Sequence, residues 1–312
     1  MKYIKNTTAF YIEENTVISL GKFDGIHRGH ELLLQYLYAK KEEGLSTVIF
    51  TFDIPPQKNK NSAEAKVLTT NEEKMHMFAQ LGVDYLVECP FTREIMCMEP
   101  ENFIEKIVRQ LHIKCIVVGE DFRFGYNRRG DYRMLQAFSA QYAYEVVVVK
   151  KIKEDARDIS STFVREEISL GNIEKANQLL GYRYFVTSVV SHGNQIGRTI
   201  GIPTINQIPP EEKLLPPNGV YITEVFIDGR KYCGVTNVGC KPTIAGKNPV
   251  GVETHILDFK EDVYEKLVTV EFVKKIRDER KFESVEVLKE QMQMDIAFAR
   301  SFFSKFVTKN IT

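Results

Sequence analysis

Residues 19–30 read Ser19-Leu-Gly-Lys-Phe-Asp-Gly-Ile-His-Arg-Gly-His30. The run before this stretch is rich in β-favouring residues, and the leucines from Leu32 to Leu37 recur at helical spacing. Gly21, Gly25 and Gly29 allow a sharp turn and let a ligand come close to the backbone. We therefore expect a strand, a glycine-rich turn and a helix in succession.

His27 and His30 fall where this helix is expected to begin. The N–H groups at a helix start attract anionic oxygens, and two imidazoles there can bind phosphates and stabilise charge that develops on them. Such a histidine pair also occurs in metal sites and at ordinary helix caps. However, no cysteine or further histidine lies near in sequence to complete a metal shell. The stretch predicts a site for nucleotide phosphates.

The composition indicates a globular protein. The 312 residues are 43% hydrophobic and 27% charged, and this length favours two domains over one. Lys plus Arg and Asp plus Glu both number 42, so the charge gives no sign of a nucleic-acid or membrane-surface partner. The five cysteines show no Cys-x-x-Cys spacing, and no apolar run is long enough to span a membrane. We expect a cytoplasmic chain, a monomer or weak homo-oligomer, that binds neither nucleic acid nor membrane.

Strands and helices alternate in the first half of the chain. Thr70, followed three residues later by Glu73, predicts a capped helix start. The alternation predicts an α/β fold with a doubly wound parallel sheet, whose ligands bind beyond the carboxyl ends of the strands. We expect strands over 17–20, 46–52, 84–88, 115–119 and 146–149, and helices up to 43, after 70 and over 99–110.

Two later segments could take part in the same site. The loop 119–131 mixes aromatic rings with arginines, which can clamp phosphates and cover a flat heterocycle, although a solvated basic loop is the plainer alternative. The segment 159–165 offers hydroxyls and an arginine at a helix start, which also suits a well-capped helix. The residues concerned are Arg123, Arg128, Arg129, Ser160, Ser161, Thr162 and Arg165.

Taken together, the strings H-x-G-H, G-E-D-F-x-F-G and I-S-S-T-x-x-R resemble the adenylyltransferase half of bacterial bifunctional FAD synthetases. The resemblance implies that this half joins FMN to ATP and releases FAD and pyrophosphate. It implies that His27 and His30 hold the ATP phosphates and stabilise the transition state. It also implies nucleotide binding by Gly21, Phe23, Asp24, Gly25, Gly29, Ser161, Thr162 and Arg165, and flavin binding by Asp121, Phe122 and Phe124.

The second half is expected to be an antiparallel β-barrel with a helix packed on it. Strands bounded by turns are expected over 184–191, 219–227, 231–238, 252–257 and 267–273, with a hairpin turn at Asp228-Gly229 and a closing helix over 284–303. We place the domain boundary so that the domains comprise residues 1–182 and 183–312.

A second glycine-rich loop covers residues 193–206. Its glycines, at four-residue intervals, leave the backbone open to a polyphosphate, although a simple glycine-rich hairpin is the plainer reading. Thr204 and Asn206 place two neutral oxygens on one face of an extended segment, which suits Mg²⁺. The predicted nucleotide-binding residues of this loop are Gly193, Gly197, Arg198 and Gly201.

This loop resembles the G-R-x-x-G-x-P-T-x-N motif of riboflavin kinases, and the segments 237–243, 252–259 and 276–282 resemble their later motifs in order. The resemblance implies phosphorylation of riboflavin to FMN, with Glu253 as general base and flavin contacts from Arg277 and Phe282. We give His255 a packing or orienting role. ATP is then the co-substrate, Mg²⁺ the cofactor, and riboflavin, FMN and FAD are substrates or products.

Three positions depart from the family patterns: Lys22, the segment 52–56 and Ile205.

Two alternatives to a bifunctional enzyme remain open. In one, a single activity is retained and the other half is a flavin- or nucleotide-binding module. In the other, the chain is a non-enzymatic regulator that responds to flavin.

Overall fold

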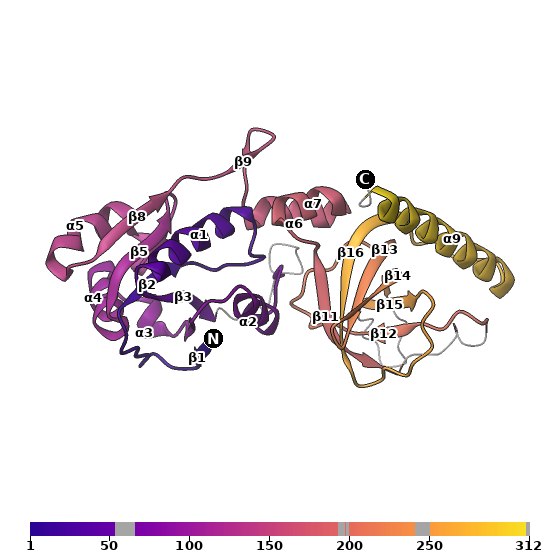
Figure 1. The fold of residues 1–312 in the computed structure, drawn as a ribbon, viewed down its shortest axis with the longest axis horizontal. Coiled ribbons are helices and arrows are strands. Elements are labelled where there is room, and N and C mark those ends of the chain that lie inside the picture. Colours follow the sequence, from indigo (N-terminus) through magenta and orange to yellow (C-terminus); the bar gives the residue numbers. More distant parts are fainter. Residues whose placement is uncertain (54–65, 193–196, 198–199, 241–249, 310–312) are drawn as a thin grey trace. The chain divides into compact units, whose positions relative to one another are not determined.

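The computed structural model describes residues 1–53, 66–192, 197, 200–240 and 250–309 (Figure 1). Two compact units are formed, one by residues 1–53 and 67–163 and the other by residue 66 and residues 164–309. Gly193 and Arg198 lie outside the described residues, as do the motif residues 54–56 and 241–243.

The first unit contains a six-stranded sheet with the order β1-β4-β3-β2-β5-β8, in which every neighbouring pair is parallel. This confirms the predicted α/β sheet. The strands of the sheet are β1 (Lys2–Lys5), β2 (Thr16–Leu20), β3 (Ser46–Asp53), β4 (Tyr85–Pro90), β5 (Ile113–Gly119) and β8 (Glu145–Val149). The helices are α1 (Arg28–Glu42), α2 (Asn71–Gln80), α3 (Arg93–Met96), α4 (Pro100–Leu111) and α5 (Tyr132–Tyr142). Two short hairpins pair β6 (Arg123–Phe124) with β7 (Gly130–Asp131) and β9 (Lys153–Glu154) with β10 (Arg157–Asp158).

Helices cover both faces of this sheet. On one face Leu34 of α1 and Phe78 of α2 are buried with residues of the strands. On the other face Ile107 of α4 and Leu135 of α5 are buried in a second apolar cluster. Both faces of the strands are therefore removed from water, which explains why strands such as β3 read as continuous apolar runs.

The strand order reverses at β2. From β2 the sheet runs through β3, β4 and β1 on one side, and through β5 and β8 on the other. In such sheets ligands bind beyond the carboxyl ends of the strands at the point of reversal. The glycine-rich turn after β2 and the loop after β5 flank this point.

The second unit contains a closed barrel with the order β11-β12-β15-β14-β13-β16, in which the strand pairs are antiparallel. The barrel strands are β11 (Phe185–Ser191), β12 (Ile205–Gln207), β13 (Gly219–Ile227), β14 (Arg230–Cys240), β15 (Val250–Ile256) and β16 (Leu267–Asp278). The helices are α6 (Ser161–Leu170), within which the division between the units falls, α7 (Ile173–Leu180) and α9 (Val285–Lys309).

The barrel has an apolar interior and an apolar outer patch. Val252 and Ile256 of β15 belong to the interior cluster. On the outside, Ala299 of α9 is buried with Ile222 and Val273 of the barrel, and Figure 1 shows α9 beside the barrel. The closing helix is therefore packed on the barrel, as predicted.

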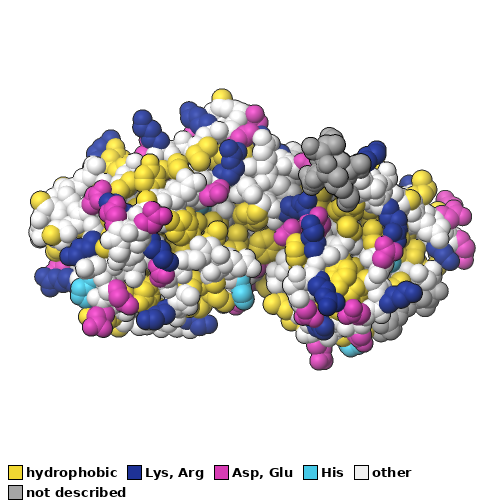
Figure 2. Space-filling model, viewed as in Figure 1, with side chains coloured by type: hydrophobic (Ala, Val, Ile, Leu, Met, Phe, Trp, Pro, Cys, Tyr) yellow, Lys and Arg dark blue, Asp and Glu magenta, His cyan; other side chains and the backbone are white. Residues whose placement is uncertain are grey.

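Several local predictions are confirmed. The Thr70 side chain and the Glu73 side chain form a capping box at the start of α2. Asp228 and Gly229 both have positive φ, as a two-residue hairpin turn requires. In the described part of the chain, no helix is long and apolar enough to cross a membrane. Basic and acidic side chains are interspersed on the face shown in Figure 2, in keeping with the balanced charge.

Candidate active sites

The conformation of the glycine-rich turn after β2 depends on a glycine at position 25 and on hydrogen bonds to Asp24. Gly25 has φ +64°, and a Cβ atom there would lie 2.6 Å from Leu68 Cδ1, so only glycine fits. The Asp24 carboxylate accepts hydrogen bonds from the backbone N–H groups of Leu68 and Thr69 at 2.7 and 3.1 Å. Asp24 therefore fixes the segment that leads into α2. Phe23 is buried.

The two histidines lie face to face. Their rings are 3.8 Å apart at an interplanar angle of 21°, and His27 is only 6% exposed. A Cβ atom on Gly29 would lie 3.1 Å from the His27 ring, which explains the glycine between the two histidines. Within the described residues, neither histidine Nδ1 atom has a hydrogen-bond partner.

Burial keeps both imidazoles neutral near pH 7. Burial lowers the pKa of His27 to about 4. The pKa of His30 is also lowered, mainly by burial and further by the charges of His27 and Lys74. A neutral imidazole still carries one N–H donor. The pair can therefore donate hydrogen bonds to phosphate oxygens from the start of α1.

Lys74 is a candidate that the sequence interpretation missed. It is 7% exposed on α2, and burial lowers its pKa, while the charges of Asp24, Glu88 and Asp53 oppose that shift. Its charge also acts on His30. Its spacing could have indicated this burial, because Lys74 lies four residues before Phe78 and residues four apart share one face of a helix.

The loop after β5 contributes to the same region. Phe124 is buried in the core and its ring stacks on that of half-buried Phe122, with the centroids 5.4 Å apart. Asp121 forms an ion pair with Lys151 at 2.8 Å, and its charge offsets a small part of the lowering of the His27 pKa that burial causes. The structure thus brings Asp121 into the electrostatic surroundings of the histidine pair.

The start of α6 is tied to the glycine-rich turn. The Ser161 hydroxyl donates to the backbone carbonyl of Asp24 at 2.7 Å, and the Ser160 hydroxyl accepts from the Phe163 N–H at 3.2 Å. Thr162 is exposed. This segment is both a helix cap and a neighbour of the predicted phosphate site.

Three further nucleotide-binding candidates lie in the second unit. Arg165 donates through Nε to the carbonyl of Lys66 at 3.2 Å. A Cβ atom on Gly197 would lie 2.3 Å from the carbonyl oxygen of Ile202, so this position requires glycine. Gly201 has φ +79° and open space around it.

Glu253 lies in a row of paired residues that crosses the barrel. It is paired with Asn206 of β12 on one side and with Asn237 of β14 on the other. Asn237 is paired with Val220 of β13, and Val220 with Arg277 of β16. Directly paired residues project from the same face of a sheet. The row therefore places a predicted metal ligand, the predicted base and a predicted flavin contact on one face.

A cavity of about 270 Å³ opens on this face, and we call it the Glu253 cavity. His255 also lines it and its Nδ1 atom lies 2.8 Å from the carbonyl oxygen of Pro203. Because a carbonyl oxygen only accepts, His255 donates from Nδ1 and holds the segment that leads into β12. Further lining residues are Gly197, Thr204, Asn237, Arg277, Phe282 and, from α9, Met292 and Asp295.

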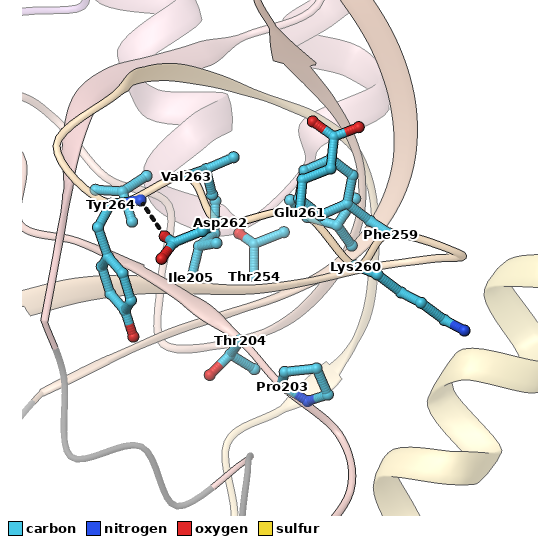
Figure 3. Close-up of a pocket in the computed structure, with 12 residues that line it drawn as sticks. Pro203, Thr204, Ile205, Thr254, Phe259, Lys260, Glu261, Asp262, Val263 and Tyr264 are labelled. Carbon is cyan, nitrogen blue, oxygen red and sulfur yellow. Dashed lines mark hydrogen bonds between the residues drawn. The ribbon is translucent and has the colours of Figure 1, made fainter.

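A second cavity, of about 370 Å³, lies on the other face of β15, and we call it the Thr254 cavity (Figure 3). Thr254 and Ile256 line it, whereas Glu253 and His255 line the first cavity, because successive strand residues point to opposite faces. Thr204 lines both cavities.

The segment 259–264 forms the remaining wall of the Thr254 cavity, and its turn is fixed by a 3.0 Å hydrogen bond from the Tyr264 N–H to the Asp262 carboxylate (Figure 3). His192 stacks on the Tyr264 ring, with the centroids 3.8 Å apart. The sequence interpretation missed this wall, although its first residue, Phe259, closes one of the quoted motifs.

Two of the departures from the family patterns fall wholly on described residues. The Lys22 side chain is exposed, and its backbone carbonyl accepts from the Thr51 hydroxyl at 3.3 Å. Ile205 packs against the interior apolar cluster of the barrel and lines the Thr254 cavity. Neither side chain disturbs the histidine pair or the paired row.

Comparisons with known proteins agree with this arrangement. The family model for FAD synthetase matches residues 10–163, and the model for riboflavin kinase matches residues 180–303. The bifunctional riboflavin kinase/FMN adenylyltransferase of Escherichia coli (strain K12) is 37% identical over 295 residues, or 93% of this chain and 94% of that protein. The protein of the same description from Listeria monocytogenes is 34% identical and covers 96% of both chains. A crystal structure described as a macrolide-efflux protein from Streptococcus pneumoniae is similar with a TM-score of 0.85 and 30% identity, and covers 96% of this chain and 98% of that one. The chain therefore belongs to the family of bifunctional riboflavin kinase/FMN adenylyltransferases.

Proposed function

We propose that this chain makes FMN from riboflavin and ATP in its second unit, and FAD and pyrophosphate from FMN and ATP in its first. The observation that carries the proposal is that each unit holds a polar cluster of its own: the stacked histidines at the start of α1, and the paired row around Glu253. Each cluster suits one of the two reactions. The proposed domains, 1–182 and 183–312, meet after α7, whereas the two compact units divide within α6.

In the first unit, a phosphate oxygen of FMN attacks the α-phosphorus of ATP while the bond to the pyrophosphate breaks. The FMN phosphate has a second pKa of about 6, so it is ionised near neutral pH and no protein base is obligatory. Neutral His27 and His30 donate hydrogen bonds to the phosphates and stabilise the charge that develops there. Ser161 and Thr162 hold the leaving pyrophosphate, with Arg165 one turn further along α6.

In the second unit, Glu253 takes the proton of the primary ribityl hydroxyl while that oxygen attacks the γ-phosphorus of ATP and ADP leaves. Riboflavin occupies the Glu253 cavity with Arg277 and Phe282, and ATP occupies the Thr254 cavity. This division is supported by Thr204, which lines both cavities, so that the reacting groups can meet beside it.

Thr204 and Asn206 are proposed to hold Mg²⁺. Their neutral oxygens fit an ion that keeps waters and substrate phosphates among its ligands. Among the described residues, no group of three or more His, Cys, Asp or Glu side chains could form a protein cage for a metal. When bound with ATP, the ion would neutralise charge on the phosphate oxygens.

A product time course tests the proposal. The purified chain is given riboflavin, ATP and Mg²⁺, a parallel reaction begins from FMN, and both products are separated by chromatography. We expect FMN as an intermediate and FAD as the end product of the first reaction, and FAD directly in the second. FAD from FMN alone would mean a silent kinase, and FMN without FAD a silent adenylyltransferase. No turnover in either reaction would favour a flavin-binding regulator.

A further inference from the structure

An ion pair in the wall of the Glu253 cavity joins α9 to strand β16 of the barrel. Asp295 is only 3% exposed, and its carboxylate accepts from Arg277 Nε at 3.1 and 3.2 Å and from Arg277 Nη2 at 2.8 Å. The Gln291 amide donates to the same carboxylate at 2.8 Å. Arg277 and Gln291 therefore both donate hydrogen bonds to the buried Asp295 carboxylate, and Arg277, which donates most of them, lies on β16 of the barrel.

The Arg277 guanidinium is held on its other sides as well. Nη1 donates to the carbonyl of Asp278 at 3.1 Å, and the guanidinium lies 5.7 Å from the centre of the Phe282 ring. A guanidinium carries five N–H donors. The hydrogen bonds to described residues thus fix its plane and still leave donor capacity for a ligand in the cavity.

We propose that Asp295, on α9, is a positioning residue for flavin binding: it holds Arg277 of the barrel in the cavity wall. The proposal rests on the proposed riboflavin site in this cavity. The Arg277 side chain is 20% exposed, so without the carboxylate the guanidinium can turn towards water, which solvates it better than a wall lacking its counter-charge. The flat donor group would then leave the flavin site.

The chain supplies a matched control for helix docking. Arg300 of α9 forms a second pair with Asp258 of the barrel, at 2.7 and 2.8 Å. Both side chains are exposed, 51% and 73% respectively, and neither lines the Glu253 cavity. Loss of this pair weakens the contact between helix and barrel without touching Arg277.

The experiment compares Asp295→Asn with Asp258→Asn in the full chain. We expect Asp295→Asn to raise KM for riboflavin about tenfold, equivalent to about 1.4 kcal/mol, with kcat and KM for ATP changed less than about twofold. Asp258→Asn should leave all three constants unchanged, and both variants should make FAD from FMN at the normal rate. An Asp295→Asn enzyme with normal KM for riboflavin, or one no different from Asp258→Asn, overturns the proposal.

A double variant shows whether Asp295 acts through Arg277. Arg277→Lys keeps the charge but loses the planar fork, so it should also raise KM for riboflavin. Adding Asp295→Asn to it should then change KM little further, because the planar fork that Asp295 is proposed to orient is already gone. Independent, multiplying effects would overturn the proposal. If Asp295→Asn fails to fold, Arg277→Lys still tests the proposal: an unchanged KM for riboflavin in that variant would overturn it. Absence of riboflavin phosphorylation in the unaltered chain would instead refute the proposed function.

Discussion

Burial makes His27 a source of pH-dependent stability. Its pKa is lowered to about 4 in the folded chain, against about 6.5 in an unfolded one. Between these values only the unfolded chain gains a proton, so the stabilisation is complete above about pH 6.5 and is lost as the pH falls towards 4. The difference amounts to about 3 kcal/mol.

We therefore expect His27→Asn to reduce the loss of stability between pH 7 and pH 4.5, measured by urea unfolding at both values. His76 is exposed, so His76→Asn is the matched control and should leave the pH dependence unchanged. Equal acid sensitivity of the His27→Asn variant and the unaltered chain would contradict the burial argument.

His30→Ala should separate the two activities. Loss of one group that stabilises transition-state charge typically costs 10²- to 10³-fold, so we expect FAD formation from FMN to fall by at least about 100-fold. Riboflavin phosphorylation should continue at its normal rate, as measured by chromatography of the products. A folded variant that loses both activities would refute the division of labour.

Glu253→Gln should have the opposite effect. An amide cannot accept the proton of the ribityl hydroxyl, so FMN formation should fall by about 10²- to 10⁴-fold. ATP binding and the formation of FAD from FMN should be retained, which equilibrium binding and the second assay measure. A variant that still phosphorylates riboflavin efficiently would remove Glu253 as the base.

At the scale of elements, the glycine-rich turn between β2 and α1 should tolerate no side chain at residue 25. Gly25→Ala combines a positive φ with a clash against Leu68, whereas Gly82→Ala adds a Cβ at φ +75° into open space. We expect a loss of about 1 kcal/mol at Gly82 and of about 2–4 kcal/mol at Gly25. Urea unfolding of both variants measures the difference, and equal losses would show that the contact with Leu68 is unimportant.

Elements with a strong local pattern were predictable from sequence. The buried strands β3 and β13 and the capped helix α2 were placed correctly because apolar runs, turns and caps are encoded within a few residues. The strand β1, with the sequence KYIK, and the three-residue strand β12 carry too little pattern.

Sequence motifs predicted most of the candidate site residues, but not how these residues are arranged in space. The pairing of Glu253 with Asn206 is a matter of strand register, and the stacking of His27 on His30 depends on the fold around them. Lys74 and Asp295 were not predicted as site residues, because a charged residue on a helix is usually solvated. Only tertiary packing turns these two side chains inward.

At the scale of the whole molecule, each unit carries its own proposed site, so the two activities should complement each other between chains. A mixture of His30→Ala and Glu253→Gln chains should make FAD from riboflavin after a lag, because FMN made by the first must reach the second through solution. Neither variant alone should do so. Chromatographic time courses test this, and a mixture that never makes FAD would show that FMN has to pass within one chain.

Side chains alternate between the two faces of β15, so the kinase half depends on which residues of this strand face which cavity. Odd-numbered Glu253 and His255 serve one cavity, while even-numbered Thr254 and Ile256 serve the other. A slip of one residue would exchange the two sets and turn the carboxylate away from the alcohol it is proposed to activate. A slip of two residues would restore every side chain to its proper face, although in another place. Insertions into this strand should therefore be tolerated, if at all, only in pairs.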